Sequence, residues 1–389
     1  MKTDSSSNVN REVLSIQYLR GIAAIIVFFS HFKNTINEIS LVNIRYLGDS
    51  LFSNGGFGVD LFFVISGFVI ALSTEKDLGR KMGAISFVIK RAFRIYPLLI
   101  VGVIAIGYLQ NIPVSKILWS MIPLHLDYMS KPPFFGYNSL YVAWTITFEL
   151  SFYLLFMVSM LVSHKYRAIV CTLAIFSLFI IIRVTTGSEI TLSATSPINH
   201  INSWLMPVAS IYSSSMMFNF IYGMIAYYAY KHIRTGALHG TILNTCLITM
   251  IVCSFFMLIG NSAIMGHGPE KWGVVSFGLI LSLTIYEKNY GIFHSKSLLH
   301  LGAISYSLYL IHPVVLYFLS INNWFDIRVS GFPKFIIGTF IVISISTITY
   351  EFLEKNHQIL EERYWRMYKG NRPARWLAYY LKCYPVCTV

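Results

Sequence analysis

Long apolar runs recur along the chain, with only short polar segments between most of them. A transmembrane helix needs about 20 mostly apolar residues, so runs of this length predict membrane spans. We predict an all-α polytopic membrane domain over residues 1–353, followed by a basic cytoplasmic tail over residues 354–389 on the membrane surface. The ten predicted spans lie near residues 13–32, 57–73, 95–110, 140–162, 168–184, 215–231, 241–260, 272–287, 302–321 and 334–353.

The composition agrees with a membrane protein and argues against a soluble one. Of the 389 residues, 55% are hydrophobic and 12% are charged, whereas soluble domains carry about 25% charged residues. The first apolar run contains Arg20 and lacks a small-residue cleavage site, so we predict a span there and not a signal peptide. Lys and Arg in cytoplasmic loops explain the net charge of +13, and nucleic acid is not an expected partner.

The distribution of Lys and Arg predicts the orientation of the chain in the membrane. With the N-terminus inside the cell, 21 of the 30 Lys and Arg residues fall on the cytoplasmic side and 7 on the outer side. This bias matches the positive-inside rule. We therefore predict that both termini are cytoplasmic.

The first two spans carry charged or titratable residues that are costly in contact with lipid. Arg20 and His31 are eleven positions apart, which places both on one helical face, about 16 Å apart along the axis. An arginine facing lipid costs about 2.5 kcal/mol or more, so this face is expected to line a protein interior or wet cavity. His31 alone would also suit the polar end of a span. Asp60 is expected to orient the His31 imidazole, to neutralise Arg20, or to act as a helix-start acid.

The third and fourth spans add further charges. Lys90, Arg91 and Arg94 precede the third span at its cytoplasmic end, and the two arginines are neighbours on one helical face. Their guanidinium groups are suited to binding phosphates through paired hydrogen bonds, or to anchoring the end of the span. Glu149 is the single acid of the fourth span, about 13 Å from its outer end, and Arg20 is its expected partner.

Other candidates lie in the spans and in the outer loops. His312 is in the middle of the ninth span, where it is expected to be either a packed core histidine or a site residue. Tyr306 and Trp144 are further candidates. No metal site is predicted, because the outer-loop histidines lack a spacing typical of metal ligands: His125, His200 and His267.

Taken together, these stretches resemble the acyltransferase-3 family of polytopic membrane enzymes, which modify bacterial glycans. The resemblance covers roughly residues 14–350. Thr145 and Thr147 stand where the fourth-span motif of the family usually has serines, so a hydroxyl is retained at both positions. The motifs that carry the resemblance are Arg20-x10-His31, "GVDLFFVISGF", Arg91-x-x-Arg94, "WTITFELSFY" and "ISYSLYLIH".

The resemblance implies transfer of an acyl group, commonly acetyl from acetyl-CoA, to a hydroxyl of a glycan or lipid-linked oligosaccharide at the bacterial inner membrane. Acyl-CoA is then a donor substrate, and no tightly bound cofactor is expected. Arg91 and Arg94, with Lys90, are expected to hold the CoA phosphates. His31 is expected to act as general base or as acyl carrier.

Within this mechanism, Asp60 or Glu149 is expected to orient the imidazole or to hold Arg20, and Arg20 is expected to stabilise the oxyanion. Three other interpretations stay open. They are a transporter or flippase of a glycan or lipid intermediate, an acyltransferase with a succinyl or longer donor, and a membrane scaffold without activity.

Overall fold

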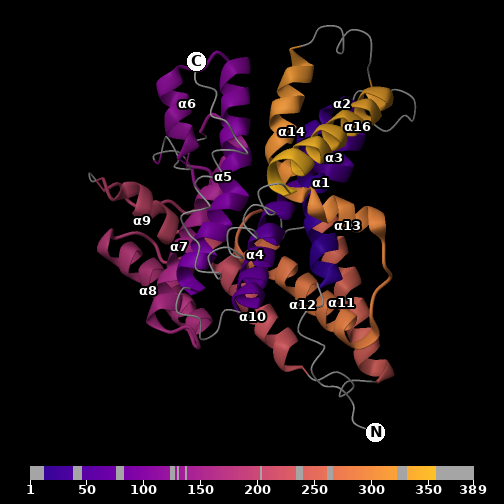
Figure 1. Ribbon diagram of the computed structural model, residues 1–389. Coiled ribbons are helices and arrows are strands. Elements are labelled where there is room, and N and C mark those ends of the chain that lie inside the picture. The colour runs from indigo at the N-terminus through magenta and orange to yellow at the C-terminus, as the bar shows by residue number, and fades with distance from the viewer. Residues whose placement is uncertain are drawn as a thin grey trace, which may run out of the picture.

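The computed structural model describes residues 13–37, 46–75, 83–122, 128, 131–135, 138–201, 204–233, 240–260, 266–321 and 331–355. Within these ranges the regular secondary structure is helical (Figure 1), and each of the ten windows predicted as spans contains a helix. The all-α membrane fold predicted from the sequence is confirmed. His125 and the tail beyond residue 355 lie outside the described residues.

The ten predicted spans correspond to α1 (Leu14–Phe32), α4 (Phe57–Glu75), α5 (Gly83–Leu109), α7 (Trp144–Val162), α8 (Arg167–Thr185), α10 (Phe218–His232), α11 (Thr241–Ile259), α12 (Val274–Tyr290), α14 (Ser305–Ser320) and α16 (Gly331–Thr349). The shorter helices are α2 (Asn34–Asn37), α3 (Leu47–Phe52), α6 (Val114–Met121), α9 (Met206–Tyr212) and α13 (Lys296–Ala303). Single turns of 3-10 or π-helix are η2 (Ser53–Gly56), η3 (Tyr141–Ala143), η4 (Ser215–Met217), η5 (Pro269–Gly273) and η6 (Tyr350–Lys355).

Length and apolarity decide which helices qualify as spans. Among the described residues, seven helices are long and apolar enough to cross a membrane, or eight if α13 and α14, which meet at a bend of 65°, form one span. At 15 and 17 residues, α10 and α12 fall short of the usual length for a span. The chain is therefore an integral membrane protein, while the count of ten spans and the side of each terminus stay predictions.

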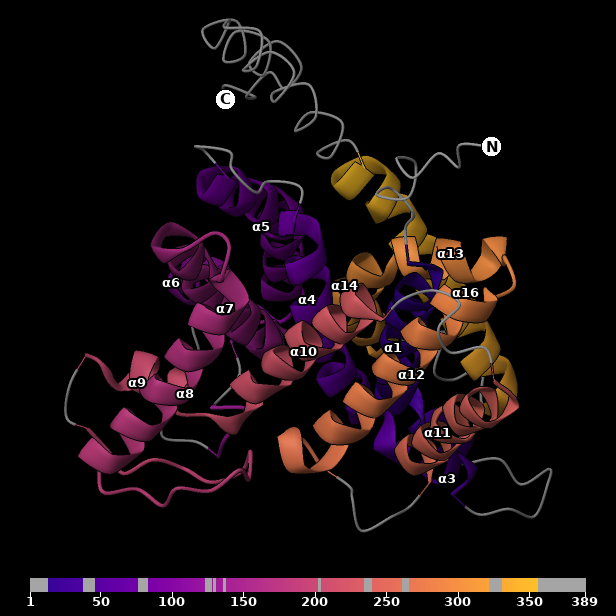
Figure 2. The same ribbon diagram turned by 90° about the horizontal axis from the view of Figure 1, so that it is seen from below.

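Two helices lie at the centre of the bundle. α4 and α10 pack against each other, with α5 to α9 on one side and α11, α12, α13 and α16 on the other (Figures 1 and 2). A Cβ atom added at Gly223 would lie 2.0 Å from Val64 O, and one added at Gly67 would lie 2.1 Å from Phe220 O. The sequence predicts close helix packing at Gly67, because glycine has no side chain, and this packing is confirmed.

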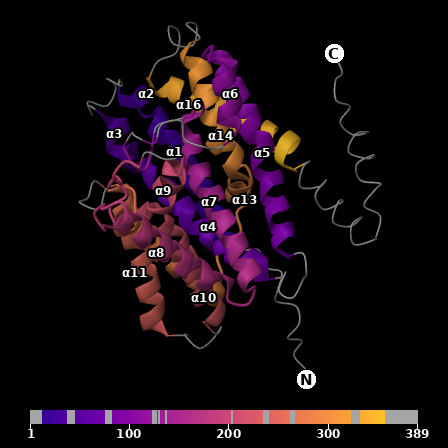
Figure 3. The same ribbon diagram turned by 90° about the vertical axis from the view of Figure 1, so that its left-hand side faces the viewer.

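Five helices surround the interior in which the charged residues meet. α1 packs against α4 and α14, α14 also packs against α5, and α5 lies beside α7 (Figure 3). α5 begins at Gly83, twelve residues before the predicted span, so Lys90, Arg91 and Arg94 lie inside the helix and not ahead of it. Hydropathy marks only the apolar part of a helix, and Lys and Arg are good helix formers that extend it.

The bundle has two ends. At the His31 end, α1 ends and α4 begins; at the Glu75 end, α4 and α10 end. The predicted orientation makes the His31 end the outer one.

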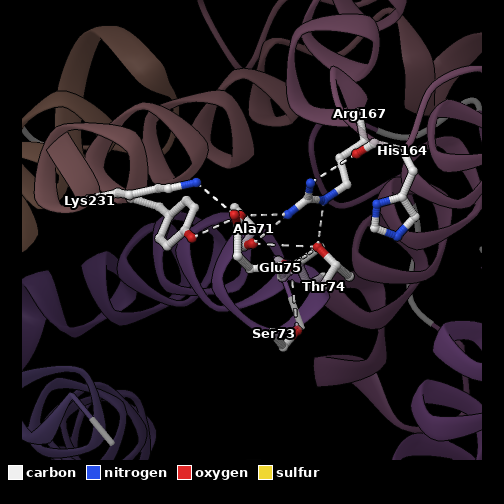
Figure 4. Close-up of polar contacts among 9 residues, drawn as sticks. Ala71, Ser73, Thr74, Glu75, His164, Arg167 and Lys231 are labelled. Atoms are coloured by element: carbon white, nitrogen blue, oxygen red, sulfur yellow. Dashed lines mark hydrogen bonds and ion pairs between the residues drawn. The ribbon is translucent and has the colours of Figure 1, made fainter. Parts of the chain in front are cut away.

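A buried polar cluster joins α4, α8 and α10 at the Glu75 end (Figure 4). Lys231 Nζ pairs with Glu75 Oε1 at 2.6 Å, and both side chains are about one third exposed. Arg167, which is only 2% exposed, pairs with the other oxygen of the same carboxylate. The Arg167 guanidinium donates hydrogen bonds to Glu75 Oε2 (3.1 Å), Thr74 Oγ1 (2.8 Å), Ala71 O (3.1 Å) and His164 O (2.9 Å).

Replacing Arg167 by methionine is expected to lower the melting temperature of the detergent-solubilised protein far more than the matched change Lys231→Met. Both variants remove one cation from Glu75. Breaking a buried pair costs about 3–5 kcal/mol, because buried partners lose their hydrogen bonds, whereas an exposed pair is worth about 0–1 kcal/mol. Equal melting temperatures for the two variants would contradict a stabilising role for Arg167.

Candidate active site

A cavity lies among α1, α4, α5, α7 and α14. Arg20 from α1, Arg94 from α5, Glu149 from α7 and Tyr306 from α14 line it. Arg20 therefore faces a cavity inside the protein, as the cost of a lipid-facing arginine predicts. The remaining wall is mostly apolar and includes Val59, Phe62, Phe63, Ile65, Ile95 and Ile146.

Glu149 lies in the same cavity as Arg20, but its direct hydrogen bonds come from elsewhere. Ser66 Oγ donates to Glu149 Oε1 at 3.1 Å, and Tyr153 OH donates to the same oxygen. Arg20 Nη1 donates to Gln17 Oε1 at 3.2 Å. Among the described residues, Arg20 and Glu149 therefore form no direct ion pair, and their opposite charges attract each other only at longer range.

A carboxylate that was predicted to belong to the tail also acts on Arg20. Glu354, in the η6 turn after α16, is 6% exposed and accepts a hydrogen bond from Ser307 Oγ. Its carboxylate and that of Glu149 both act on the Arg20 guanidinium, as does Arg94. Two acids thus balance two arginines, which reduces the cost of burying each charge.

The helical spacing of the last span did not predict the burial of Glu354. The buried positions of α16 are Gly338, Val342 and Ser346, and Glu354, eight residues after Ser346, would lie about 80° further round an ideal helix. Its burial depends on the π-helical turn η6 and on its contact with Ser307. The spacing of Tyr153 from Glu149, four residues along α7, is by contrast a signal that the sequence contains.

Arg91 and Arg94 are one turn apart and have different surroundings. Arg91 Nη2 donates to Ser73 Oγ at 3.1 Å, and its guanidinium lies 5.6 Å from the ring centroids of Phe87 and Tyr153. Arg94 lines the cavity instead. In this structure, Arg91 and Arg94 therefore do not form one joint phosphate-binding pair.

The basic residues nevertheless form a series along α5 that leads toward the cavity. Lys90 is exposed, Arg91 is half-buried, and Arg94 lines the same cavity as Arg20. An anion that enters along this series meets positive charge at each step, which raises its local concentration.

His31 lies in a second cavity, at the other end of α1 from Arg20. This cavity, of about 820 Å³, is open to the outside of the protein. Its polar lining includes His31, Thr35, Tyr141, Tyr317, Ser320 and Lys334.

A buried histidine on α14 contacts the His31 ring. His31 Nδ1 lies 2.9 Å from His312 Nε2, and the two rings are stacked, with centroids 5.2 Å apart. His312 is completely buried. It is therefore a packed core histidine that is in direct contact with His31.

Tyr309 lies between the cavity of Arg20 and the histidine pair. It lines the cavity of Arg20, and its ring centroid lies 6.1 Å from that of His312. Its hydroxyl forms hydrogen bonds with Thr145 Oγ1 at 2.9 Å and Val142 O at 3.2 Å. Arg20 and His31, although on one helix, are thus separated by the layer that Tyr309 and His312 form.

Asp60 does not orient His31 or neutralise Arg20, contrary to two of the three roles expected for it. It is completely buried and contacts His267 Nδ1 at 2.7 Å, Asn219 Nδ2 at 2.7 Å and Gly268 N at 2.9 Å. The reason is the rotation of α4. Gly58 faces α1, and a residue two positions later lies about 200° further round the helix, facing away from α1.

His267 is a loop histidine with a specific partner, and Trp144 belongs to its surroundings. The His267 ring packs edge-on against Phe134, Trp144 and Trp272, with centroid distances of 5.6, 5.6 and 5.0 Å. Trp144 is 5% exposed and helps to enclose this histidine. Tyr306 is in the cavity of Arg20, and its hydroxyl donates to Ile95 O at 2.8 Å.

Among the described residues, His, Cys, Asp and Glu side chains form no group of three or more able to hold a metal ion.

The chain belongs to the acyltransferase-3 family, because the acyltransferase domain that defines this family matches residues 13–351. Among curated proteins, nodulation protein 10 of Rhizobium leguminosarum bv. viciae is 31% identical over 156 residues, which are 35% of this chain and 41% of that protein. The exopolysaccharide production protein ExoZ of Rhizobium meliloti is 29% identical over 160 residues, 38% of this chain and 48% of ExoZ. The matches thus span less than half of each relative. No solved structure matches the chain significantly.

Proposed function

We propose that this protein is a membrane O-acyltransferase that moves an acyl group, acetyl in the simplest case, from acyl-CoA to a hydroxyl of a glycan or lipid-linked oligosaccharide. The observation that carries the proposal is the cavity lined by Arg20, Arg94 and Glu149, with Tyr309 and His312 between it and the pocket of His31. Family membership supports acyl transfer, and the name of ExoZ supports a polysaccharide acceptor.

The donor side of the proposal rests on the series of basic residues along α5. The phosphates of CoA are strongly anionic, and Arg binds phosphate through paired, charge-assisted hydrogen bonds. We assign Lys90 and Arg91 to the 3′-phosphate of CoA and Arg94 to its diphosphate, which is nearer the thioester. With the predicted orientation, this entry faces the cytoplasm of a bacterial cell, where CoA is found.

In the chemical step, the acceptor hydroxyl gives its proton to His31 while its oxygen attacks the thioester carbonyl. The bond from the carbonyl carbon to the acceptor oxygen forms, the bond from that carbon to sulfur breaks, and the CoA thiolate takes up the proton. Arg20 lies in the other cavity, about 16 Å from His31 along α1, so we assign it with Arg94 to the incoming donor and not to the carbonyl oxygen at His31, and Glu149 and Glu354 hold Arg20 in position through their charge. A route in which His31 first accepts the acyl group requires the same residues.

The proposal is tested with purified protein in liposomes that contain a lipid-linked oligosaccharide. Addition of acetyl-CoA is expected to release free CoA thiol and to produce an ester on the oligosaccharide, detected by mass spectrometry. Succinyl-CoA and longer acyl-CoA donors are compared in the same assay. Movement of the oligosaccharide across the bilayer without any thiol release would support a flippase instead.

A further inference from the structure

A chain of hydrogen bonds runs from the backbone of α14 to His31. His312 Nδ1 lies 3.0 Å from Leu308 O, and His312 Nε2 lies 2.9 Å from His31 Nδ1. His312 is completely buried, and its ring is held between Phe28 and Tyr309, with centroid distances of 6.0 and 6.1 Å. The position of each ring nitrogen is therefore set by its neighbours.

The direction of each hydrogen bond follows from the carbonyl oxygen. A backbone carbonyl can only accept, so His312 Nδ1 carries a proton and donates it to Leu308 O. A neutral imidazole has one N–H, which makes His312 Nε2 an acceptor. His31 Nδ1 must then be the donor, and its Nε2 keeps a lone pair.

Two cations lie near the histidine pair. Lys33, directly after α1, and Lys334 on α16 are near His31, and Asp49 is paired with Lys33 at 2.8 Å. The other titratable groups that face His31 are Tyr141 and the Tyr317 hydroxyl of α14, neutral at neutral pH. A proton added to either histidine would place a positive charge near these two lysines.

We propose that His312 is a positioning residue that holds His31 in the Nδ1–H tautomer, so that His31 Nε2 is the atom that takes the proton from the acceptor hydroxyl. The catalytic consequence rests on the proposed function. When Nε2 gains that proton, the positive charge on His31 is shared through its Nδ1–H with His312 Nε2. When the carbon–sulfur bond breaks, the proton passes from His31 Nε2 to the thiolate, and both rings return to the neutral state.

Two substitutions distinguish the role of His312 as a hydrogen-bond acceptor from the effect of its size. In His312→Gln, the side-chain oxygen occupies a position similar to that of Nε2 and accepts from His31 Nδ1–H. In His312→Leu, a side chain of similar size offers no acceptor. Leucine is expected to lower kcat by about 10²-fold while the KM for acetyl-CoA is unchanged, and glutamine is expected to restore most of the rate.

The test uses the full-length protein in liposomes, labelled with ¹⁵N at histidine, and compares the wild type with both variants. Solid-state NMR distinguishes protonated from bare ring nitrogens, and a difference spectrum against His31→Gln assigns the His31 signals. We expect a bare Nε2 on His31 in the wild type and in His312→Gln, and loss of this preference in His312→Leu.

A protonated Nε2 on His31 in the wild type would overturn the proposal, even if the leucine variant fails to fold. So would a leucine variant with an unchanged tautomer, kcat and melting temperature. The NMR measurement needs no donor or acceptor. Absence of turnover with every acyl-CoA would therefore contradict the proposed function and leave the tautomer assignment standing.

Discussion

Replacing His31 by glutamine is expected to lower kcat for acyl transfer by about 10²–10⁴-fold, because the acceptor hydroxyl loses the base that takes its proton. His31 is exposed in its pocket, so little packing is lost and the melting temperature is expected to stay close to that of the wild type. The measurement is the rate of CoA thiol release in liposomes at saturating acetyl-CoA and acceptor.

The matched control for this variant is His300→Gln. His300 is an exposed histidine on α13 with a single hydrogen bond to Thr347 Oγ1, and it lines neither cavity. It is expected to keep the wild-type rate. A His31→Gln protein that binds acetyl-CoA and transfers acetyl at the normal rate would eliminate His31 as base and as acyl carrier.

Replacing Arg94 by glutamine is expected to lower kcat/KM for acetyl-CoA by about 10- to 100-fold, mainly through a higher KM. The guanidinium lines the cavity at the inner end of the basic series on α5. A hydrogen bond to a charged group is worth about 1.5–3 kcal/mol, and 1.4 kcal/mol corresponds to a factor of ten. The measurement is the dependence of thiol release on acetyl-CoA concentration.

Two controls test whether the effect is specific to Arg94 and to the phosphates of CoA. Lys165→Gln removes a cation from an exposed position next to α8 and is expected to leave the KM unchanged. Acetyl-pantetheine carries the thioester without the nucleotide phosphates, so the effect of Arg94→Gln is expected to disappear with this donor. An unchanged KM for acetyl-CoA would indicate that Arg94 only anchors the end of the helix.

Several features of the fold were predictable because they depend on short stretches of sequence. Each predicted apolar window contains a helix, since hydropathy over some 20 residues selects backbone that must satisfy its own hydrogen bonds in lipid. The inward orientation of Arg20 followed from the cost of the alternative, and the close contact at Gly67 followed from the absence of a side chain.

The partners of the polar residues were much less predictable. Asp60 was expected to act on His31 or Arg20, yet it contacts a histidine 207 residues away. The position of a residue along a helix does not determine which way the helix is rotated, and with Gly58 facing α1, Asp60 faces away from it. Glu354 was assigned to the tail because hydropathy falls before it, and only the packing of η6 shows that it is buried.

The sequence by itself determined that the chain crosses a membrane as apolar helices and that Arg20 and His31 share one helical face. Both conclusions depend on local hydropathy and on the period of 3.6 residues, which each segment carries in full. Only the tertiary structure decided that these two residues line separate cavities, and that His31 meets His312, 281 residues further along the chain. Such contacts depend on the rotation and depth at which each helix packs against its neighbours, and no single segment encodes these.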